Sequence, residues 1–178
     1  MQDIAQMASW ARIALAAAAL AGASVGQADT LPGPLPAANI SLEQAERVVA
    51  ATIDYARQNK TALTVVVVDA AGHVVTGARM NGVPFGTFDV ARGKAIASVA
   101  TGGVSGRALM ERYKANPIVF GQISSLSYGG PMFPSQGSLP IFHNGVLIGA
   151  VGASGASSQL DEDAGRAGIA AIGAKESR

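Results

Sequence analysis

The residues whose types and spacing most suggest catalysis or ligand binding lie in a short segment near the C-terminus. Gly149, Gly152 and Gly155 recur at every third position, and Ser154 lies between the last two. This glycine spacing matches neither the dinucleotide-binding fingerprint nor the P-loop. The sequence around Ser154 lacks the last glycine of a nucleophile elbow, so we expect a turn residue there. Glycines in a strand indicate a place where another backbone or a ligand comes close, and we predict that role here.

Three acidic residues, Asp161, Glu162 and Asp163, follow this glycine segment. Carboxylates in such a group can hold a hard cation. They can also stabilise the start of a helix, where the macrodipole favours negative charge. The capping residue Ser157 just before them favours the second interpretation. The same carboxylates would repel phosphate, which argues against a nucleotide site.

Composition excludes several classes of protein. The chain has 178 residues, which is typical of one domain with a substantial core. Its net charge is +1 and only 14% of its residues are charged, so it lacks the dense basic surface of a nucleic-acid-binding protein. It contains no cysteine, which excludes disulfides, thiolate metal sites, cysteine nucleophiles and covalent c-type haem attachment.

The N-terminal residues predict export. Arg12 precedes the apolar segment Ile13–Val25, and Gly26-Gln27-Ala28 offers small residues at a cleavage site. We therefore expect a signal peptide over 1–28, a proline-rich linker over 29–40, and a periplasmic or secreted domain without a membrane contact after processing. A misassigned start codon or a retained membrane anchor are the alternatives.

The remaining elements follow from periodicity, turn residues and capping signals. We predict first a helix from Ser41 and then two strands, over 63–68 and 73–79, joined by a turn. A helix from Thr87 to Val99 follows, and then a shorter helix from Ser105 that Pro117 closes. A hairpin over 139–155, turning at Asn144-Gly145, and a final helix complete the chain. Residues 115–138 have no sustained period, so we expect an irregular loop that forms the wall of a site.

This order of elements predicts an α+β fold. Two hairpins with helices between and after them form an antiparallel sheet with helices packed on its faces. The hairpin connections are too short for crossovers, which argues against a doubly wound parallel sheet.

Several of these segments together resemble one known family. The motifs are Val66-Val67-Val68-Asp69, Gly72, Arg79-Met80-Asn81-Gly82, Lys94-Ala95, Leu139-Pro140-Ile141, Asn144-Gly145, the run from Gly149 to Gly155, and Asp161-Glu162. They are similar to those of the GlcG/HbpS-like haem-binding family, which includes the C-terminal domain of the propanediol-utilisation cobalamin adenosyltransferase. The resemblance extends over about 41–173, and we predict a folded domain of this family over 41–175.

The resemblance implies a profilin-like layered sandwich with a sheet of about five strands. It also implies a homo-oligomer that binds haem non-covalently outside the cytoplasm. Relatives have been linked to haem or iron handling and to redox sensing with a partner sensor protein. A binding protein is therefore favoured over an enzyme, and no catalytic residue is assigned.

Haem binding requires an apolar slot, a donor for the iron and cations for the propionates. In a secreted relative, a threonine at the start of the short helix holds the iron, and Ser105 matches it here. The other candidate donors are His73, His143, Tyr113, Tyr128, Met80, Met110 and Met132, and the candidate propionate partners are Arg79, Arg92, Lys94 and Arg107. From these we expect a haem site made by Ser105, His73, His143, Arg79, Lys94 and Tyr128. Each histidine flanks a predicted turn, which favours a solvated hairpin residue over an iron ligand.

Two other functions remain open. A pocket lined by the 115–138 loop, Arg79 and Lys94 would suit an enzyme or binding protein for a small organic acid, with Lys94 or His73 as the acid/base group. A structural or sensor-accessory protein without a ligand is the third class.

Overall fold

The computed structural model describes residues 37–126, 130 and 132–178. The predicted signal peptide, most of the predicted linker, and Tyr128 lie outside the described residues. Within the described part of the chain, no helix is both long and apolar enough to cross a membrane.

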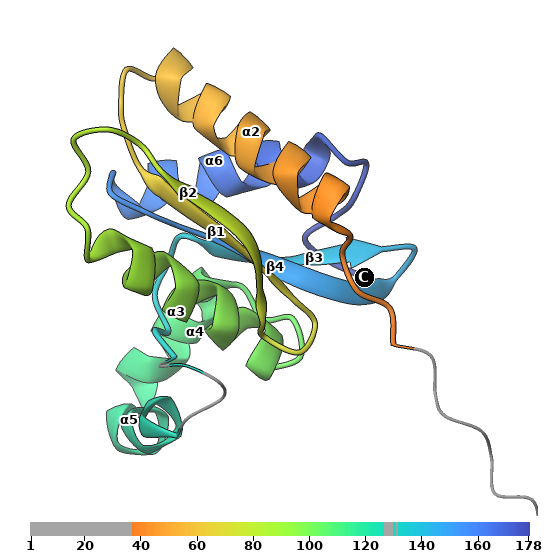
Figure 1. Cartoon of the computed structure of the whole chain (residues 1–178). Helices are drawn as coiled ribbons and strands as arrows, with labels where there is room; N and C mark the ends of the chain where they lie inside the picture. Colours follow the sequence, from red (N-terminus) through yellow and green to blue (C-terminus); the bar gives the residue numbers. More distant parts are fainter. Residues whose placement is uncertain (1–36, 127–129, 131) are drawn as a thin grey trace, which may run out of the picture. The chain divides into compact units, whose positions relative to one another are not determined.

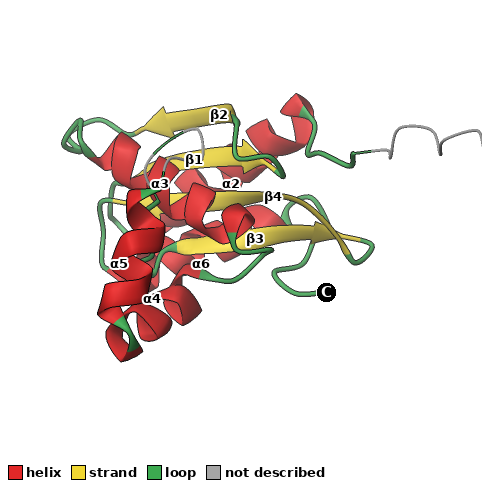
Figure 2. Cartoon of the chain, turned by 90° about the horizontal axis from the view of Figure 1, so that it is seen from below, coloured by secondary structure: helices red, strands yellow, loops and turns green. Residues whose placement is uncertain are grey.

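A four-stranded antiparallel sheet forms the centre of the fold, in the order β2-β1-β4-β3 (Figures 1 and 2). The strands are β1 (Thr64–Asp69), β2 (Val74–Arg79), β3 (Ser138–His143) and β4 (Val146–Ser154). Each predicted hairpin is present, and β1 pairs with β4 to join them. The described chain has four strands where the resemblance implied about five, because each hairpin contributes only two.

Both hairpin turns form as their residues predict. Asn144 and Gly145 have φ angles of 50° and 78°, the two positive values of a type I′ turn. In the first hairpin, the Asp69 carboxylate accepts hydrogen bonds from the backbone N–H groups of Ala71 and His73, both at 2.9 Å. Local side-chain chemistry therefore fixes the register of both hairpins.

Helices cover both faces of the sheet, which confirms the α+β class. In Figure 1, α2 (Leu42–Gln58) and α6 (Ser158–Ala170) lie on one face, and α3 (Thr87–Ala100) lies on the other with α4 (Gly106–Ala115). Two clusters of buried apolar side chains form the core, one on each side of the sheet. The predicted capping box opens α2, where Ser41 and Gln44 exchange side-chain to backbone hydrogen bonds.

The prediction of an irregular loop over 115–138 is wrong in its first half, where α5 (Pro117–Ser125) forms. Pro117 begins this helix instead of only closing the one before it, because its fixed φ suits the first helical turn. Asn116 caps α5 by accepting a hydrogen bond from Val119 N at 3.4 Å. The sequence of α5 shows little alternation of apolar and polar residues, because this helix has no fully buried face.

The three glycines around β4 allow the close approaches that their spacing predicts. A Cβ on Gly152 would overlap the carbonyl oxygen of Ala91 and lie 2.9 Å from Ala95 N, both in the backbone of α3. A Cβ on Gly149 would overlap the carbonyl oxygen of Val68 on β1, and Gly155 has a φ of 137°. Helix α3 therefore packs on β4 backbone to backbone at Gly152.

A buried ion pair links α3 to α6 across the end of β4. Lys94 Nζ donates to the carbonyl oxygen of Ala153 at 2.8 Å and to Asp161 Oδ2 at 3.3 Å. Asp161 Oδ1 accepts from Ala156 N at 3.1 Å, and Lys94 and Asp161 are only 4% and 2% exposed. Burial lowers the pKa of Lys94 and raises the pKa of Asp161, and the opposite charge of each partner counteracts these shifts.

We expect Gly152→Ala to destabilise the protein by about 2–3 kcal/mol, because the added methyl group overlaps the α3 backbone. Urea unfolding of the variant measures this loss. Gly86→Ala is the control: Gly86 has an ordinary φ of −64° and no atom within 4 Å of an added Cβ, so its stability should stay within about 0.5 kcal/mol of the parent. Equal stability of both variants would contradict the close contact.

The variants Lys94→Met and Asp161→Asn should each lose about 3–5 kcal/mol at neutral pH, because each leaves a buried charge without its partner. Their pH dependences should have opposite signs. In Lys94→Met, the pKa of Asp161 is raised above its unfolded value of 3.8, so stability falls as pH rises through the folded-state pKa. In Asp161→Asn, the pKa of Lys94 is lowered below 10.5, so stability rises with pH toward that value.

Urea unfolding at a series of pH values tests this pair of predictions. If the free energy of unfolding changed with pH in the same direction in both variants, the charges of Lys94 and Asp161 would not balance each other in the folded protein.

Candidate functional site

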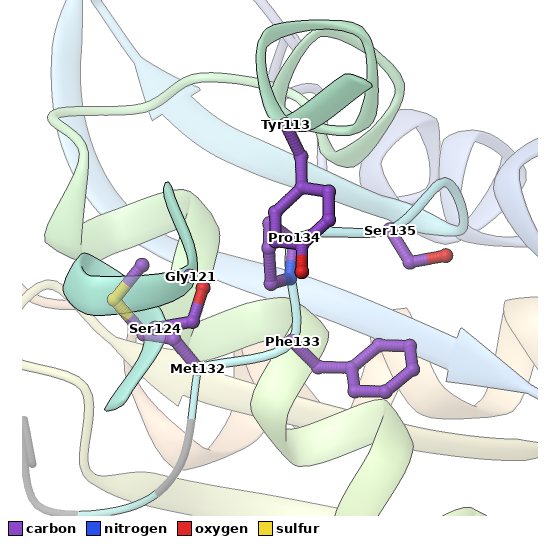
Figure 3. A pocket seen from close by; sticks show the side chains of 7 residues that line it. All are labelled: Tyr113, Gly121, Ser124, Met132, Phe133, Pro134 and Ser135. Carbon is purple, nitrogen blue, oxygen red and sulfur yellow. The ribbon is translucent and has the colours of Figure 1, made fainter. Parts of the chain in front are cut away.

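A cavity of about 390 Å³ lies between α4, α5 and the segment that leads into β3. Its size falls within the range of small-molecule sites. The lining residues are Tyr113, Gly121, Ser124, Met132, Phe133, Pro134 and Ser135 (Figure 3). The second half of the 115–138 segment therefore forms one wall of the cavity.

Backbone contacts fix the segment 132–135 that forms this wall. Phe133 N donates to the carbonyl oxygen of Gly93 in α3 at 3.0 Å. At the start of α4, a Cβ on Gly106 would overlap the carbonyl oxygen of Ser135, so only glycine permits this approach. The wall is thus held between α3 and α4.

The lining is mostly apolar and contains two donors that can bind haem iron. Figure 3 shows the Tyr113 ring reaching from α4 toward Pro134. Its phenolic oxygen and the thioether of Met132 are both ligand types found in haem proteins. Met132 is 6% exposed, whereas Tyr113 and Phe133 are 40% and 46% exposed, so the cavity is buried at one end and open at the other.

A cation approaches the same segment from α3. A Cβ on Gly130 would overlap the Arg92 guanidinium, so this cation lies beside a residue that precedes Met132 by two positions in the sequence. The cavity therefore meets two requirements of a haem site, an apolar wall and an oxygen or sulfur donor, and Arg92 does not line it.

The structure does not bring together those predicted haem residues that it describes. Ser105 is the N-cap of α4, where its Oγ accepts a hydrogen bond from Ala108 N at 3.3 Å. His73 lies in the first hairpin turn with its side chain 78% exposed and its Nδ1 3.4 Å from Asp69 Oδ2. His143 ends β3 at the second turn and is also exposed. None of the three lines the cavity.

The pocket proposed for an organic acid does not form as a single site. Lys94 is buried in its pair with Asp161, and Arg79 lines a different cavity, at the end of β2. Neither residue lines the cavity beside the 132–135 segment.

The acidic group has a role that neither interpretation of the sequence included. The Asp161 carboxylate balances the positive charge of Lys94. Glu162 Oε1 lies 3.1 Å from both Arg107 Nη2 and Arg166 Nη2. Arg107 is therefore an ion-pair partner of Glu162 in this structure. Among the described residues, no group of three or more histidine, aspartate or glutamate side chains is arranged to hold a metal ion.

The sequence indicated Tyr113 and Met132 as donors and the 115–138 segment as a wall, but not that part of this wall is helical. Gly121 and Ser124 lie on α5, which was not predicted, so their position beside α4 could not be anticipated. The available signal was Asn116-Pro117, a capping residue followed by a first-turn proline.

Comparisons with known proteins agree with this fold. The crystal structure of PduOC in complex with haem matches with a TM-score of 0.70 and 25% identity, over 79% of this chain and 99% of that one. The HbpS crystal structure matches with a TM-score of 0.69 and 23% identity, over 79% and 96%. The Klebsiella pneumoniae protein ORFY matches with a TM-score of 0.70 and 22% identity, over 83% and 99%. No curated protein matches the chain.

A family model described as "Haem degrading protein HbpS-like" matches residues 40–170, which is most of the chain. The chain therefore belongs to the HbpS-like family.

Proposed function

We propose that this protein binds haem non-covalently in the cavity between α4, α5 and the 132–135 segment. The observation that carries the proposal is the placement of Tyr113 and Met132 in one mostly apolar cavity, in a chain of a haem-binding family. A relative of the same fold has been crystallised as a haem complex.

Each part of the lining has a defined task in this proposal. Tyr113 supplies an oxygen donor from α4, and Met132 supplies a sulfur donor from the buried end. Phe133 and Pro134 offer apolar surface to a porphyrin ring, which is the main source of affinity for such a ligand. Bound haem would supply iron for redox or ligand-binding chemistry.

Helix α5, which supplies two residues to the cavity lining, also exposes large apolar side chains. The side chains of Ile118, Val119 and Leu126, on and just after α5, are 74%, 43% and 55% exposed. Large apolar side chains exposed on neighbouring positions mark an interaction surface. A haem edge or a second copy of the chain would cover them, which supports the homo-oligomer implied by the family.

Haemin titrated into the purified apoprotein should give a saturable Soret band. We expect Tyr113→Phe or Met132→Leu to shift the Soret maximum and to weaken binding about tenfold, because each substitution removes a donor while nearly preserving side-chain volume. His73→Ala and His143→Ala should leave the spectrum unchanged, because both side chains are exposed at the hairpin turns.

Ser105→Ala separates the two possible oxygen donors. If Ser105 holds the iron, as the relative's threonine does, this variant alone will change the spectrum. A spectrum that changes only in a histidine variant would contradict the proposed cavity.

The physiological part of the proposal is that the mature protein is exported, assembles into homo-oligomers and handles haem or iron, or serves as an accessory to a redox sensor. The apolar segment Ile13–Val25 and the small residues after it support export. Intact mass and sedimentation of the protein from a periplasmic fraction should show loss of 1–28 and an assembly larger than a monomer. An uncleaved chain confined to the cytoplasm would contradict export, and a monomer would contradict assembly.

A further inference from the structure

A second cavity lies between the end of α2 and the end of β2. Its volume is about 370 Å³, which is within the range of small-molecule sites. It is lined by Ile53, Arg57, Arg79, Met80 and Asn81. It shares no lining residue with the cavity beside α5.

This cavity carries an excess of positive charge, because two guanidinium groups line it. Arg57 pairs with Asp54 at 3.1 Å, but both side chains are more than 60% exposed, so water screens the pair strongly. Arg79 makes one side-chain hydrogen bond, from Nη1 to the carbonyl oxygen of Val83, and forms no ion pair with any described residue. Asp54 itself does not line the cavity.

Two residues of the lining, Arg79 and Met80, are held in position before any ligand arrives. The pairing of Arg79 with Thr64 fixes its backbone in the sheet, and the Val83 carbonyl holds one guanidinium nitrogen. The Met80 sulfur accepts a hydrogen bond from Leu63 N at 3.4 Å, which fixes that side chain as well. A guanidinium already held at one edge loses less freedom when it binds an anion with the other.

We propose that this cavity binds a small organic carboxylate, independently of haem. The planar forks of Arg57 and Arg79 match carboxylate oxygens, and the Asn81 amide adds a donor. Ile53 and Met80 provide an apolar surface for a short hydrocarbon body. Inorganic phosphate has no hydrocarbon body and would leave that surface without a partner.

Succinate titrated into the full-length apoprotein tests the site, with arginine side-chain Nε–Hε signals followed by NMR. We expect saturable shifts for Arg57 and Arg79 and weaker binding of inorganic phosphate. Arg57→Gln and Arg79→Gln should each weaken succinate binding about tenfold, because each removes one charge-assisted contact. Arg47→Gln is the matched control, because Arg47 is an exposed cation of the same helix that does not line the cavity.

Several outcomes would overturn the proposal: no saturable response to succinate, undiminished binding by Arg57→Gln, or phosphate binding as tightly as succinate. Arg57→Gln keeps the test decisive if loss of the Val83 contact unfolds the Arg79 variant. Haemin binding is measured on the same variants and should be unchanged, because neither arginine lines the first cavity. Failure of either site is therefore distinguishable from failure of the other.

Discussion

The structure depends on the direct contact between the backbone of α3 and β4 at Gly152. A side chain at this position would overlap Ala91 and crowd Ala95, so the helix can lie this close only on glycine. The contact allows small residues of α3, such as Ala91 and Ala95, to be fully buried against the sheet. It also determines how closely the rest of α3 lies to the sheet.

One consequence is the burial of Lys94, which lies between Ala91 and Ala95 on the same helix. Its side chain is almost fully shielded from water, so the positive charge must be balanced inside the protein, and Asp161 and the Ala153 carbonyl do this. The ion pair in turn fixes the start of α6 against α3 through the end of β4. The other consequence lies at Gly93, whose carbonyl accepts the hydrogen bond that holds Phe133 in the cavity wall. The sheet contact and the candidate haem site are thus connected through one helix.

The sequence predicted the sheet well because local chemistry determines it. The Asn144-Gly145 turn, the Asp69 turn and the capping box at Ser41 each act over a few residues, and all three form as expected. The α+β class followed from the order of these elements. Helix α5 was missed because it buries none of its side chains and therefore shows little amphipathic period.

The candidate site was less predictable, because it depends on tertiary contacts between distant segments. The histidines were candidate iron donors, but their places beside predicted turns also indicated solvated side chains, and both are exposed in the structure. Tyr113 and Met132 line the same cavity although they are distant in the sequence, and helix α5 between them supplies part of the lining. The partner of Lys94 lies 67 residues away, and no local pattern relates the two.

Hydrogen–deuterium exchange of the apoprotein and the haemin-loaded protein tests most directly whether haem binds in the proposed cavity. We predict that haemin increases protection in α4, α5 and the 132–135 segment and leaves the two hairpin turns unchanged. Protection confined to the turns that carry His73 and His143 would contradict this account.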